Sequence, residues 1–301
     1  MRLSKHALVI PVAGLMLVAG MTGCASKKKA AATASPSPKN VIVKDDALAA
    51  LVPAKIRAAG KISAATDASY APDEFYASDN KTIVGMDVHL GKAIGQVLGL
   101  DMTFTNTGFD GILASLGSRY DIGMSSFTDN KKREKVVDMV TYYSAGTGFA
   151  VKSDSTLNIA TLADLCGHSA AAEKGTTQYD DLVAQAKKCT TGKLTAVAFP
   201  DQNAATLAVI SGRSDVVLGD APTIAYAVTK SAGKLKIGGT QYGAAPYGIA
   251  VPKSTAYKGL ADAIKGALEK LIANGDYAKI LATWNLSAGA ITTPVINGAI
   301  S

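Results

Sequence analysis

The sequence predicts an α/β protein made of two consecutive α/β units, each with a mainly parallel sheet covered by helices on both faces. From Lys61 to about Val137, short apolar runs typical of strands alternate with segments whose apolar residues recur at helical spacing. The same alternation starts again after Val151 and continues to Trp284. Strands that alternate with helices in this way are typical of parallel sheets.

The elements of the first unit follow from periodicity and capping. Val88, Ile94 and Leu98 fall on one face of a helix, and Asn130 is a candidate N-cap for a later one. In chain order we expect a strand over 61–66, a helix over 87–98, a strand over 102–105, a helix over 109–116, a strand over 121–126 and a helix over 130–137.

The second unit repeats the pattern, and two helices complete the folded part, which runs from about Asp45 to Leu286. This length is enough for two modest domains or one large one. We expect helices over 162–165, 177–186, 203–210, 221–228, 260–274 and 277–284, and strands over 169–172, 194–199, 215–218 and 247–251.

The first residues have the composition of an export signal. Arg2 and Lys5 precede an apolar run that is shorter than the roughly 20 residues of a membrane-spanning helix and ends at Cys24. The segment resembles a bacterial lipoprotein signal, in which residues 1–23 are removed and the Cys24 thiol receives a lipid. The alternative is an ordinary signal peptide cut nearby, with Cys24 incidental. We therefore expect a lipid-anchored protein on the extracytoplasmic face of the cell membrane.

Residues 24–44 have too few apolar side chains to fold, so they predict a disordered tether. The formal net charge of the whole chain is +7, and loss of Arg2 and Lys5 with the signal leaves 7 − 2 = +5. The basic residues are scattered along the chain rather than gathered in a stripe, so we expect no nucleic-acid partner.

The cysteines and histidines limit the covalent and metal chemistry. If Cys24 carries a lipid, Cys166 and Cys189 remain as a pair in an oxidising compartment. A disulfide between them would close a loop of about 22 residues and stabilise the fold by roughly 3 kcal/mol. The alternative is two free buried thiols. The three histidines lack the spacing of a zinc site, so we expect neither a metal nor a cofactor.

Short motifs recur in a fixed order along residues 60–286. They are Thr66-Asp-Ala-Ser-Tyr-Ala-Pro-Asp-Glu-Phe75, Ile83-Val-Gly-Met-Asp87, Phe109-Asp-Gly-Ile-Leu, Tyr120-Asp-Ile, Ser125-Ser-Phe-Thr128, Arg133-Glu-Lys-Val-Val-Asp138, Tyr142-Tyr-Ser, Lys174-Gly-Thr-Thr-Gln178, Gly219-Asp-Ala, Tyr247-Gly-Ile-Ala-Val251 and Asn274-Gly-Asp-Tyr-Ala-Lys-Ile to Trp284. The ordered set resembles the polar amino-acid family (family 3) of ABC-transporter solute-binding proteins, which includes histidine-, lysine/arginine/ornithine- and glutamine-binding proteins.

The resemblance implies a two-lobed α/β fold of the periplasmic-binding-protein type (type II), with two crossover strands as hinge and the ligand in the cleft between the lobes. Lobe 1 would comprise residues 45–150 and 250–290, and lobe 2 residues 151–249. Residues 291–301 would form a C-terminal tail. The crossovers would lie near 149–152 and 248–251. The sequence departs from the family at Asp73, where an aromatic residue is usual, and at Gly219, which supplies no side chain beside Asp220.

A free amino acid carries a carboxylate and an ammonium, so its site needs a cation, an anion and further hydrogen bonds. Arg133 is the best candidate for the cation because a guanidinium can meet a carboxylate with two parallel hydrogen bonds. The resemblance implies this role for Arg133 and gives the ammonium to Asp220. The alternatives are a surface arginine in a basic run and an aspartate that caps the following helix.

Nine further positions complete the site that the resemblance implies. They are hydroxyl residues of each lobe, two aromatic walls and two acids that face the ligand's side chain; the alternatives are turn-forming hydroxyls and plain core aromatics. The two acids together favour a cationic side chain such as arginine or lysine and disfavour glutamate. The residues are Ser125, Ser126 and Thr128 of lobe 1, Thr176 and Thr177 of lobe 2, the aromatics Tyr70 and Phe109, and the acids Asp67 and Glu173.

We therefore expect a monomeric binding protein, not an enzyme, that captures a polar or basic L-amino acid by closing lobe 2 over it and delivers it to an ABC permease. One rival is a module that reports ligand binding to a membrane receptor. Another is a dehydratase of the same fold, with Glu173 as general acid. In the sequence, no nucleophile–base pair, metal cluster or phosphate loop accompanies Glu173.

Overall fold

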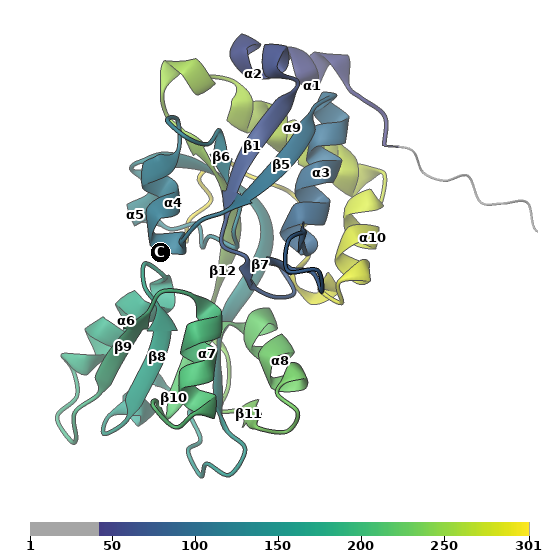
Figure 1. The fold of residues 1–301 in the computed structure, drawn as a ribbon. Helices are drawn as coiled ribbons and strands as arrows, with labels where there is room; N and C mark the ends of the chain where they lie inside the picture. Colours follow the sequence, from purple (N-terminus) through teal and green to yellow (C-terminus); the bar gives the residue numbers. More distant parts are fainter. Residues whose placement is uncertain (1–41, 301) are drawn as a thin grey trace, which may run out of the picture. The chain divides into compact units, whose positions relative to one another are not determined.

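Within residues 42–300, which the computed structural model describes, nine strands form one sheet. The strand order is β5-β1-β6-β12-β7-β10-β8-β9, with β11 beside β7 (Figure 1). The flanking strands are parallel to one another, whereas β7 is antiparallel to β12, β10 and β11. The strands are β1 Lys61–Thr66, β5 Asp101–Asn106, β6 Ile122–Gly123, β7 Val137–Lys152, β8 Ser169–Glu173, β9 Thr195–Phe199, β10 Val216–Asp220, β11 Leu235–Ile237 and β12 Tyr242–Pro252.

The two longest strands, β7 and β12, pass between two hydrophobic cores (Figure 1). In β7, Tyr142 belongs to the core of lobe 1, which surrounds β1, and Phe149 to the core of lobe 2, which surrounds β8. In β12, Tyr242 packs against the lobe 2 core and Tyr247 lies in the lobe 1 core. The two-lobed fold with two connecting strands is therefore as predicted.

The connections differ in detail from the sequence prediction. The chain passes between the cores before residues 149–152 and before residues 248–251, not at these segments. The helix expected over 130–137 is the short α5, Lys131–Glu134, and β7 already begins at Val137. Nearly all of β7 is buried, so its sequence lacks the alternation of apolar and polar residues that marks a half-exposed strand.

Helices cover the lobe 1 sheet and pack their apolar stripes against it. Ile94 and Leu98 from one helix and Ile264 and Leu268 from another are buried in the same core. Two N-terminal helices were not expected, and the first begins where the Asp45 carboxylate accepts the Leu48 N–H at 3.0 Å. The helices are α1 Asp46–Leu51, α2 Ala54–Ala59, α3 Met86–Leu98, α4 Phe109–Ser115, α9 Leu260–Ala273 and α10 Asp276–Thr283, with 3₁₀ turns η2 Thr255–Tyr257 and η3 Ser287–Gly289.

Lobe 2 is held by its own core and by a disulfide. Cys166 and Cys189 are bonded, with Cα atoms 5.5 Å apart, as the oxidising-compartment interpretation expected. The bond ties the end of the 3₁₀ turn before β8 to the chain after the next helix. The helical elements are η1 Leu162–Leu165, α6 Thr177–Ala186, α7 Gln202–Ile210 and α8 Ala221–Lys230.

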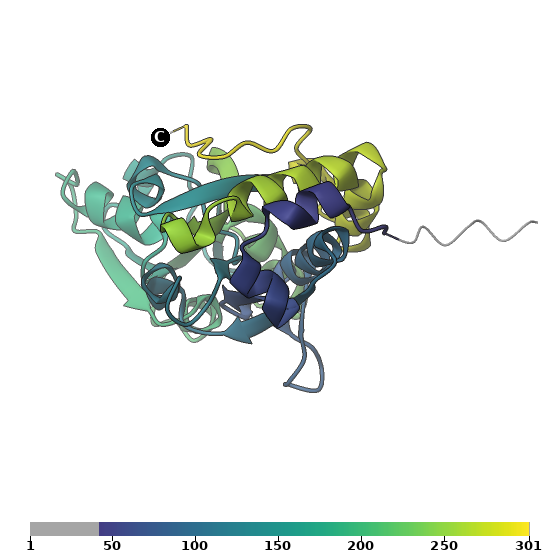
Figure 2. The same cartoon turned by 90° about the horizontal axis from the view of Figure 1, so that it is seen from above.

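Three further features complete the description. A small sheet of β2 Ser69–Tyr70, β3 Glu74–Tyr76 and β4 Ile83–Val84 was not expected. Residues 291–300, expected as a tail, run as an extended segment alongside β7 (Figure 2). The expected signal peptide and Cys24, with all but the last residues of the tether, lie outside the described residues. In residues 42–300, no helix is both long and apolar enough to cross a bilayer.

Candidate functional site

Arg133 lies on α5 at the boundary between the lobes. The Asn130 side chain accepts the Arg133 N–H at 2.8 Å and so caps the turn that carries it. The guanidinium donates through Nη1 to the Thr128 carbonyl at 2.8 Å and through Nη2 to the Gly175 carbonyl of lobe 2 at 3.1 Å. Two of its five N–H donors are therefore bound to backbone oxygens that fix its direction.

Two aromatic rings flank this guanidinium. Its central carbon lies 5.4 Å from the Phe109 ring centroid and 5.1 Å from that of Phe127. Arg133 is 7% exposed, and burial lowers its pKa to about 10, so it remains charged at neutral pH. In the described part of the chain, no carboxylate lies within 4.0 Å of it. Removing a cation of this kind from water is costly unless an anion or further hydrogen bonds compensate it.

Asp220 supplies a buried anion from the other lobe. It ends β10 and precedes α8, yet its side chain makes no capping hydrogen bond to that helix. Its Oδ1 instead accepts the Gln178 side-chain amide at 2.8 Å. Burial raises the pKa of Asp220 to about 6, while Tyr247, Gln178 and the charge of Arg133 oppose the rise. A buried cation and a buried anion thus come from opposite lobes and form no ion pair with each other.

A second pair of acids lies beside the aromatic residues Tyr70 and Phe109, whose ring centroids are 5.8 Å apart. The Asp67 Oδ2 accepts the Phe109 N–H at 3.0 Å. Glu173 is fully buried, and neither of its oxygens has a hydrogen-bond partner among the described residues. Burial and the neighbouring Asp67 raise the pKa of Glu173 to about 10, although the Tyr70 hydroxyl acts in the opposite direction. Burial also raises the pKa of Asp67.

The hydroxyls of Ser125 and Ser126 form hydrogen bonds within lobe 1. The Ser125 Oγ donates to Glu74 Oε1 at 2.7 Å and accepts the Asp67 N–H at 2.9 Å. The Ser126 Oγ donates to Glu74 Oε2 at 3.3 Å. These hydroxyls hold Asp67 and Glu74 in place, and direct contact of the two serines with a ligand stays a prediction.

Three buried acids lie behind these serines. Burial raises the pKa of all three, Asp73, Glu74 and Asp87, and brings that of Asp87 to about 7. The charge of Asp87 raises the pKa of Asp73 and Glu74 further. Asp87 is held by the Tyr142 hydroxyl, which donates to it at 2.8 Å. Asp73, where the family usually has an aromatic residue, is fully buried, and its oxygens lack hydrogen-bond partners in residues 42–300. Its charge also raises the pKa of nearby tyrosines such as Tyr143.

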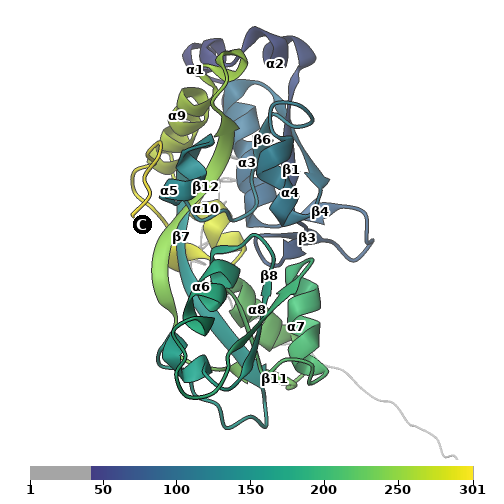
Figure 3. The same ribbon diagram turned by 90° about the vertical axis from the view of Figure 1, so that its left-hand side faces the viewer.

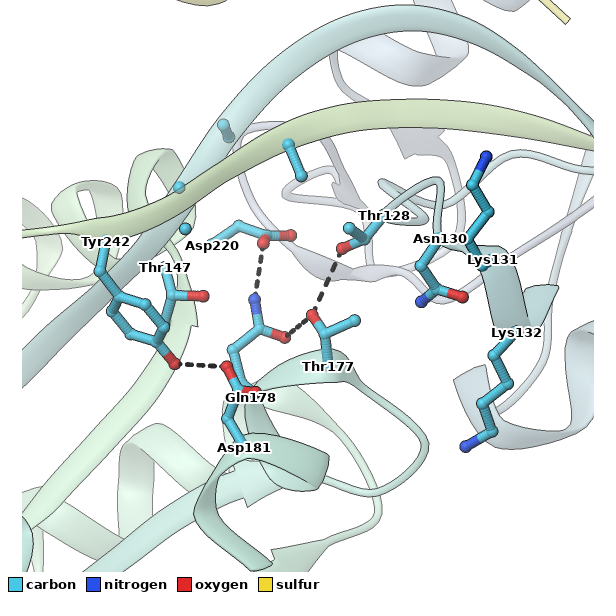
Figure 4. A pocket seen from close by; sticks show the side chains of 14 residues that line it. Thr128, Asn130, Lys131, Lys132, Thr147, Thr177, Gln178, Asp181, Asp220 and Tyr242 are labelled. Carbon is cyan, nitrogen blue, oxygen red and sulfur yellow. Dashed lines mark hydrogen bonds between the residues drawn. The ribbon is translucent and has the colours of Figure 1, made fainter. Parts of the chain in front are cut away.

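A pocket of about 320 Å³ opens beside Asp220 (Figure 4). The Thr128 and Thr177 hydroxyls, one from each lobe, hydrogen-bond across its edge at 3.3 Å. Thr177 then donates to the Gln178 Oε1 at 3.2 Å, and Gln178 donates to Asp220. Thr176 does not take part in this chain of hydrogen bonds. Its hydroxyl caps α6 by accepting the Tyr179 N–H at 3.1 Å.

Further contacts join the lobes at the rim. Lys174 pairs with Asp110 at 2.7 Å and Lys132 with Asp180 at 3.1 Å, both between exposed side chains. These pairs and the threonine contact show that the lobes meet in this structure. Exposed ion pairs of this kind contribute little free energy.

The structure brings most of the expected residues together, and it adds three that the sequence did not single out. Phe127 stacks on Phe109 with centroids 4.4 Å apart, Gln178 holds Asp220, and the Gly175 carbonyl holds Arg133. Each lies inside one of the motifs quoted above. Their roles were missed because a motif position does not reveal whether a side chain meets a ligand or a neighbouring residue.

Comparisons with known proteins agree with this geometry. The sequence pattern of the bacterial extracellular solute-binding proteins, family 3, matches residues 62–287. The arginine-binding protein of Corynebacterium glutamicum is 30% identical over 253 residues, which cover 82% of this chain and 82% of that protein.

Solved structures are similar as well. An ancestral arginine-binding protein bound to arginine has a TM-score of 0.68 and 32% identity, over 75% of this chain and 98% of that one. An ancestral amino-acid-binding protein described as a precursor of cyclohexadienyl dehydratase has a TM-score of 0.68 and 29% identity, over 76% of this chain and 97% of that one.

Proposed function

Because this chain belongs to family 3 of the bacterial extracellular solute-binding proteins, we propose that it binds L-arginine between its lobes and delivers it to an ABC importer. The observation that carries the proposal is the unpaired, buried couple of Arg133 and Asp220, one from each lobe. An α-carboxylate on Arg133 and an α-ammonium on Asp220 would neutralise both charges at once.

The opposite end of the site supports a cationic side chain. The aliphatic stem of arginine would pack against the rings of Tyr70 and Phe109, which contact each other. Its guanidinium would reach Asp67 and Glu173, two buried acids without a cation beside them in the described residues. Glutamate would place a negative charge beside these two acids in place of the positive charge that they lack, so the site disfavours it. The similar proteins named for arginine support the same ligand.

Closure of the lobes follows from where these charges lie. Lobe 1 supplies Arg133, Tyr70 and Asp67, and lobe 2 supplies Asp220 and Glu173. Bringing the lobes together moves the acids of both into one poorly hydrated space, which is unfavourable without a cation. A ligand that carries two positive charges and one negative charge relieves this cost only in the closed form. It therefore shifts the population towards closure.

The proposed setting is the outer face of the cell membrane, with the chain anchored by a lipid on Cys24 and acting as a monomer. Mass spectrometry of the mature N-terminus tests the anchor, because lipidation adds the mass of its acyl chains to Cys24. A receptor instead of a permease remains the alternative partner, and co-purification with an ABC permease from detergent-solubilised membranes would distinguish the two.

The binding proposal is tested by titrating the purified protein with each of the twenty L-amino acids. We expect L-arginine to raise the melting temperature most and to bind tightly in calorimetry. The matched control is Arg133→Lys, which keeps the charge but loses the planar fork and so weakens binding without unfolding the protein. If no amino acid shifts the melting temperature, the proposed function is wrong.

One observation favours a second function, a dehydratase. Glu173 is buried with a pKa raised to about 10, so it is protonated at neutral pH and able to donate a proton. One of the similar structures is described as a dehydratase precursor. Incubation with arogenate or prephenate, followed by detection of the aromatic product, tests this activity. Turnover that disappears in Glu173→Gln would support it.

A further inference from the structure

The last described residues run beside β7 and pair with it through an antiparallel bridge between Val140 and Ile296. Thr141 and Val295 bond reciprocally: the Thr141 N–H donates to the Val295 carbonyl at 2.9 Å, and the Val295 N–H donates to the Thr141 hydroxyl at 2.8 Å. Two residues on, the Asn297 N–H donates to the Met139 carbonyl at 2.7 Å, and the Asn297 Oδ1 accepts the Met139 N–H at 3.0 Å. Residues 291–300, the C-terminal segment, are thus fixed against lobe 1.

Beyond Asn297, this segment reaches the turn that carries Arg133 (Figure 3). The Gly298 N–H donates to Asp129 Oδ2 at 2.8 Å, and the Ala299 N–H donates to Glu134 Oε1 at 2.9 Å. Two consecutive backbone amides therefore bind the carboxylate of Asp129, which precedes α5, and that of Glu134, the last residue of α5, whose other oxygen accepts from Lys131 Nζ at 3.1 Å. Bonds to a charged acceptor are stronger than those between neutral groups.

These bonds bear on Arg133 through its neighbours. Asp129 follows Thr128, whose carbonyl accepts from the guanidinium, and Glu134 directly follows Arg133. Asp129 is fully buried, and its charge is among those that raise the pKa of Arg133. Asp129 precedes the N-cap of α5, and its carboxylate, once freed from Gly298, would compete with a ligand carboxylate for the guanidinium.

We propose that the backbone amides of Gly298 and Ala299 position Arg133 for the ligand by holding Asp129 and Glu134 away from its guanidinium. The inference rests on the proposed function in one respect, that Arg133 meets a ligand carboxylate. The C-terminal segment lies outside residues 62–287, the region that matches the family.

Two truncations of the full chain test the proposal. One ends at Asn297 and removes both donors but keeps the bonds to β7; the control ends at Ala299 and keeps the donors. Both create a new terminal carboxylate at the end of the same segment. Calorimetry should show L-arginine binding at least about tenfold more weakly to the first truncation than to the second, because two hydrogen bonds to charged groups are lost.

L-Argininamide, which has no carboxylate, separates positioning from general damage. The proposal predicts that its affinity is the same in both truncations, even if the shorter chain melts at a lower temperature because it lacks the two hydrogen bonds. Equal losses for arginine and its amide, or no loss for arginine, would overturn the proposal. If wild-type protein does not bind L-arginine, the proposed function fails instead, and the same series is run with L-glutamine and L-glutamine amide.

Should the shorter truncation not fold, point variants give the same answer. Ala299→Pro removes the N–H donor and keeps the Glu134 carboxylate, whereas Ala299→Gly keeps the donor. We expect arginine affinity to fall in the first variant and to stay near the wild-type value in the second. An equal affinity in both contradicts the proposal.

Discussion

Binding of arginine should release a proton from Glu173. This side chain is fully buried beside Asp67 and Tyr70, and its pKa is raised to about 10. At pH 7, about three pH units lower, ionising it costs about 4 kcal/mol. A guanidinium about 4 Å away returns about 4 kcal/mol at the effective dielectric constant of protein sites. The cost and the gain nearly cancel at pH 7. The pair of ionised Glu173 and the ligand's guanidinium therefore becomes favourable only when hydrogen bonds add to the attraction, and its formation depends steeply on pH.

The direction in which arginine affinity changes with pH follows from the protonation state of Glu173 in the free protein and in the complex. Free protein carries the proton, and the complex with a cationic side chain does not, so the complex binds fewer protons. Arginine affinity should therefore rise with pH, by up to about tenfold per pH unit between pH 6 and 8. Asp67, whose pKa is also raised, adds to this dependence at the lower end.

The assay is calorimetry at pH 7 in phosphate and in Tris, two buffers whose ionisation enthalpies differ strongly. The difference between the observed enthalpies gives the number of protons released, expected to approach one for L-arginine. It should fall to near zero for L-citrulline, whose side chain is uncharged, and for L-arginine with the Glu173→Gln variant. Equal proton release by the wild type and Glu173→Gln, with the same pH slope, would refute the reasoning.

Three other predictions concern single contacts. Arg133→Ala should weaken arginine binding at least about a hundredfold, since losing one partner of a buried charge pair costs roughly 3–5 kcal/mol; calorimetry that finds an unchanged Kd contradicts the site. Replacing Cys166 and Cys189 by serine should lower the free energy of unfolding by roughly 3 kcal/mol, measured by urea titration, and a change below about 1 kcal/mol would argue against the loop-closure account. Asp73→Asn should raise the melting temperature of the ligand-free protein more at pH 8 than at pH 5. Because the pKa of Asp73 is higher in the folded than in the unfolded protein, the wild type loses stability as the pH rises above the unfolded-state pKa. The amide does not ionise, so the variant avoids this loss. A gain that is independent of pH would contradict it.

The alternation of strands and helices could be predicted from the sequence because most elements pack one apolar face against a sheet. The strand β7 could not, since it is buried on both sides and its apolar residues follow no period. The extended segment around Asn297 was interpreted as a tail for a related reason. Its order comes from hydrogen bonds to Met139 and Thr141, which are more than 150 positions away in the chain.

At the site, the family resemblance pointed to Arg133 and Asp220, and both are buried near the boundary between the lobes. Their contact with a ligand stays a prediction, and the roles of the hydroxyls were not apparent from the sequence. A serine satisfies a buried acid as readily as a ligand. Ser125 is engaged with Glu74, 51 positions away, and nothing in the local sequence indicates that contact.

The most direct test of the account is a crystal structure of the protein grown with L-arginine. The account predicts the α-carboxylate on Arg133, the α-ammonium on Asp220, the ligand's aliphatic stem against Tyr70 and Phe109, and its guanidinium within hydrogen-bond distance of Asp67 or Glu173. A ligand bound in the reverse direction, or an Arg133 side chain turned towards solvent, would contradict it.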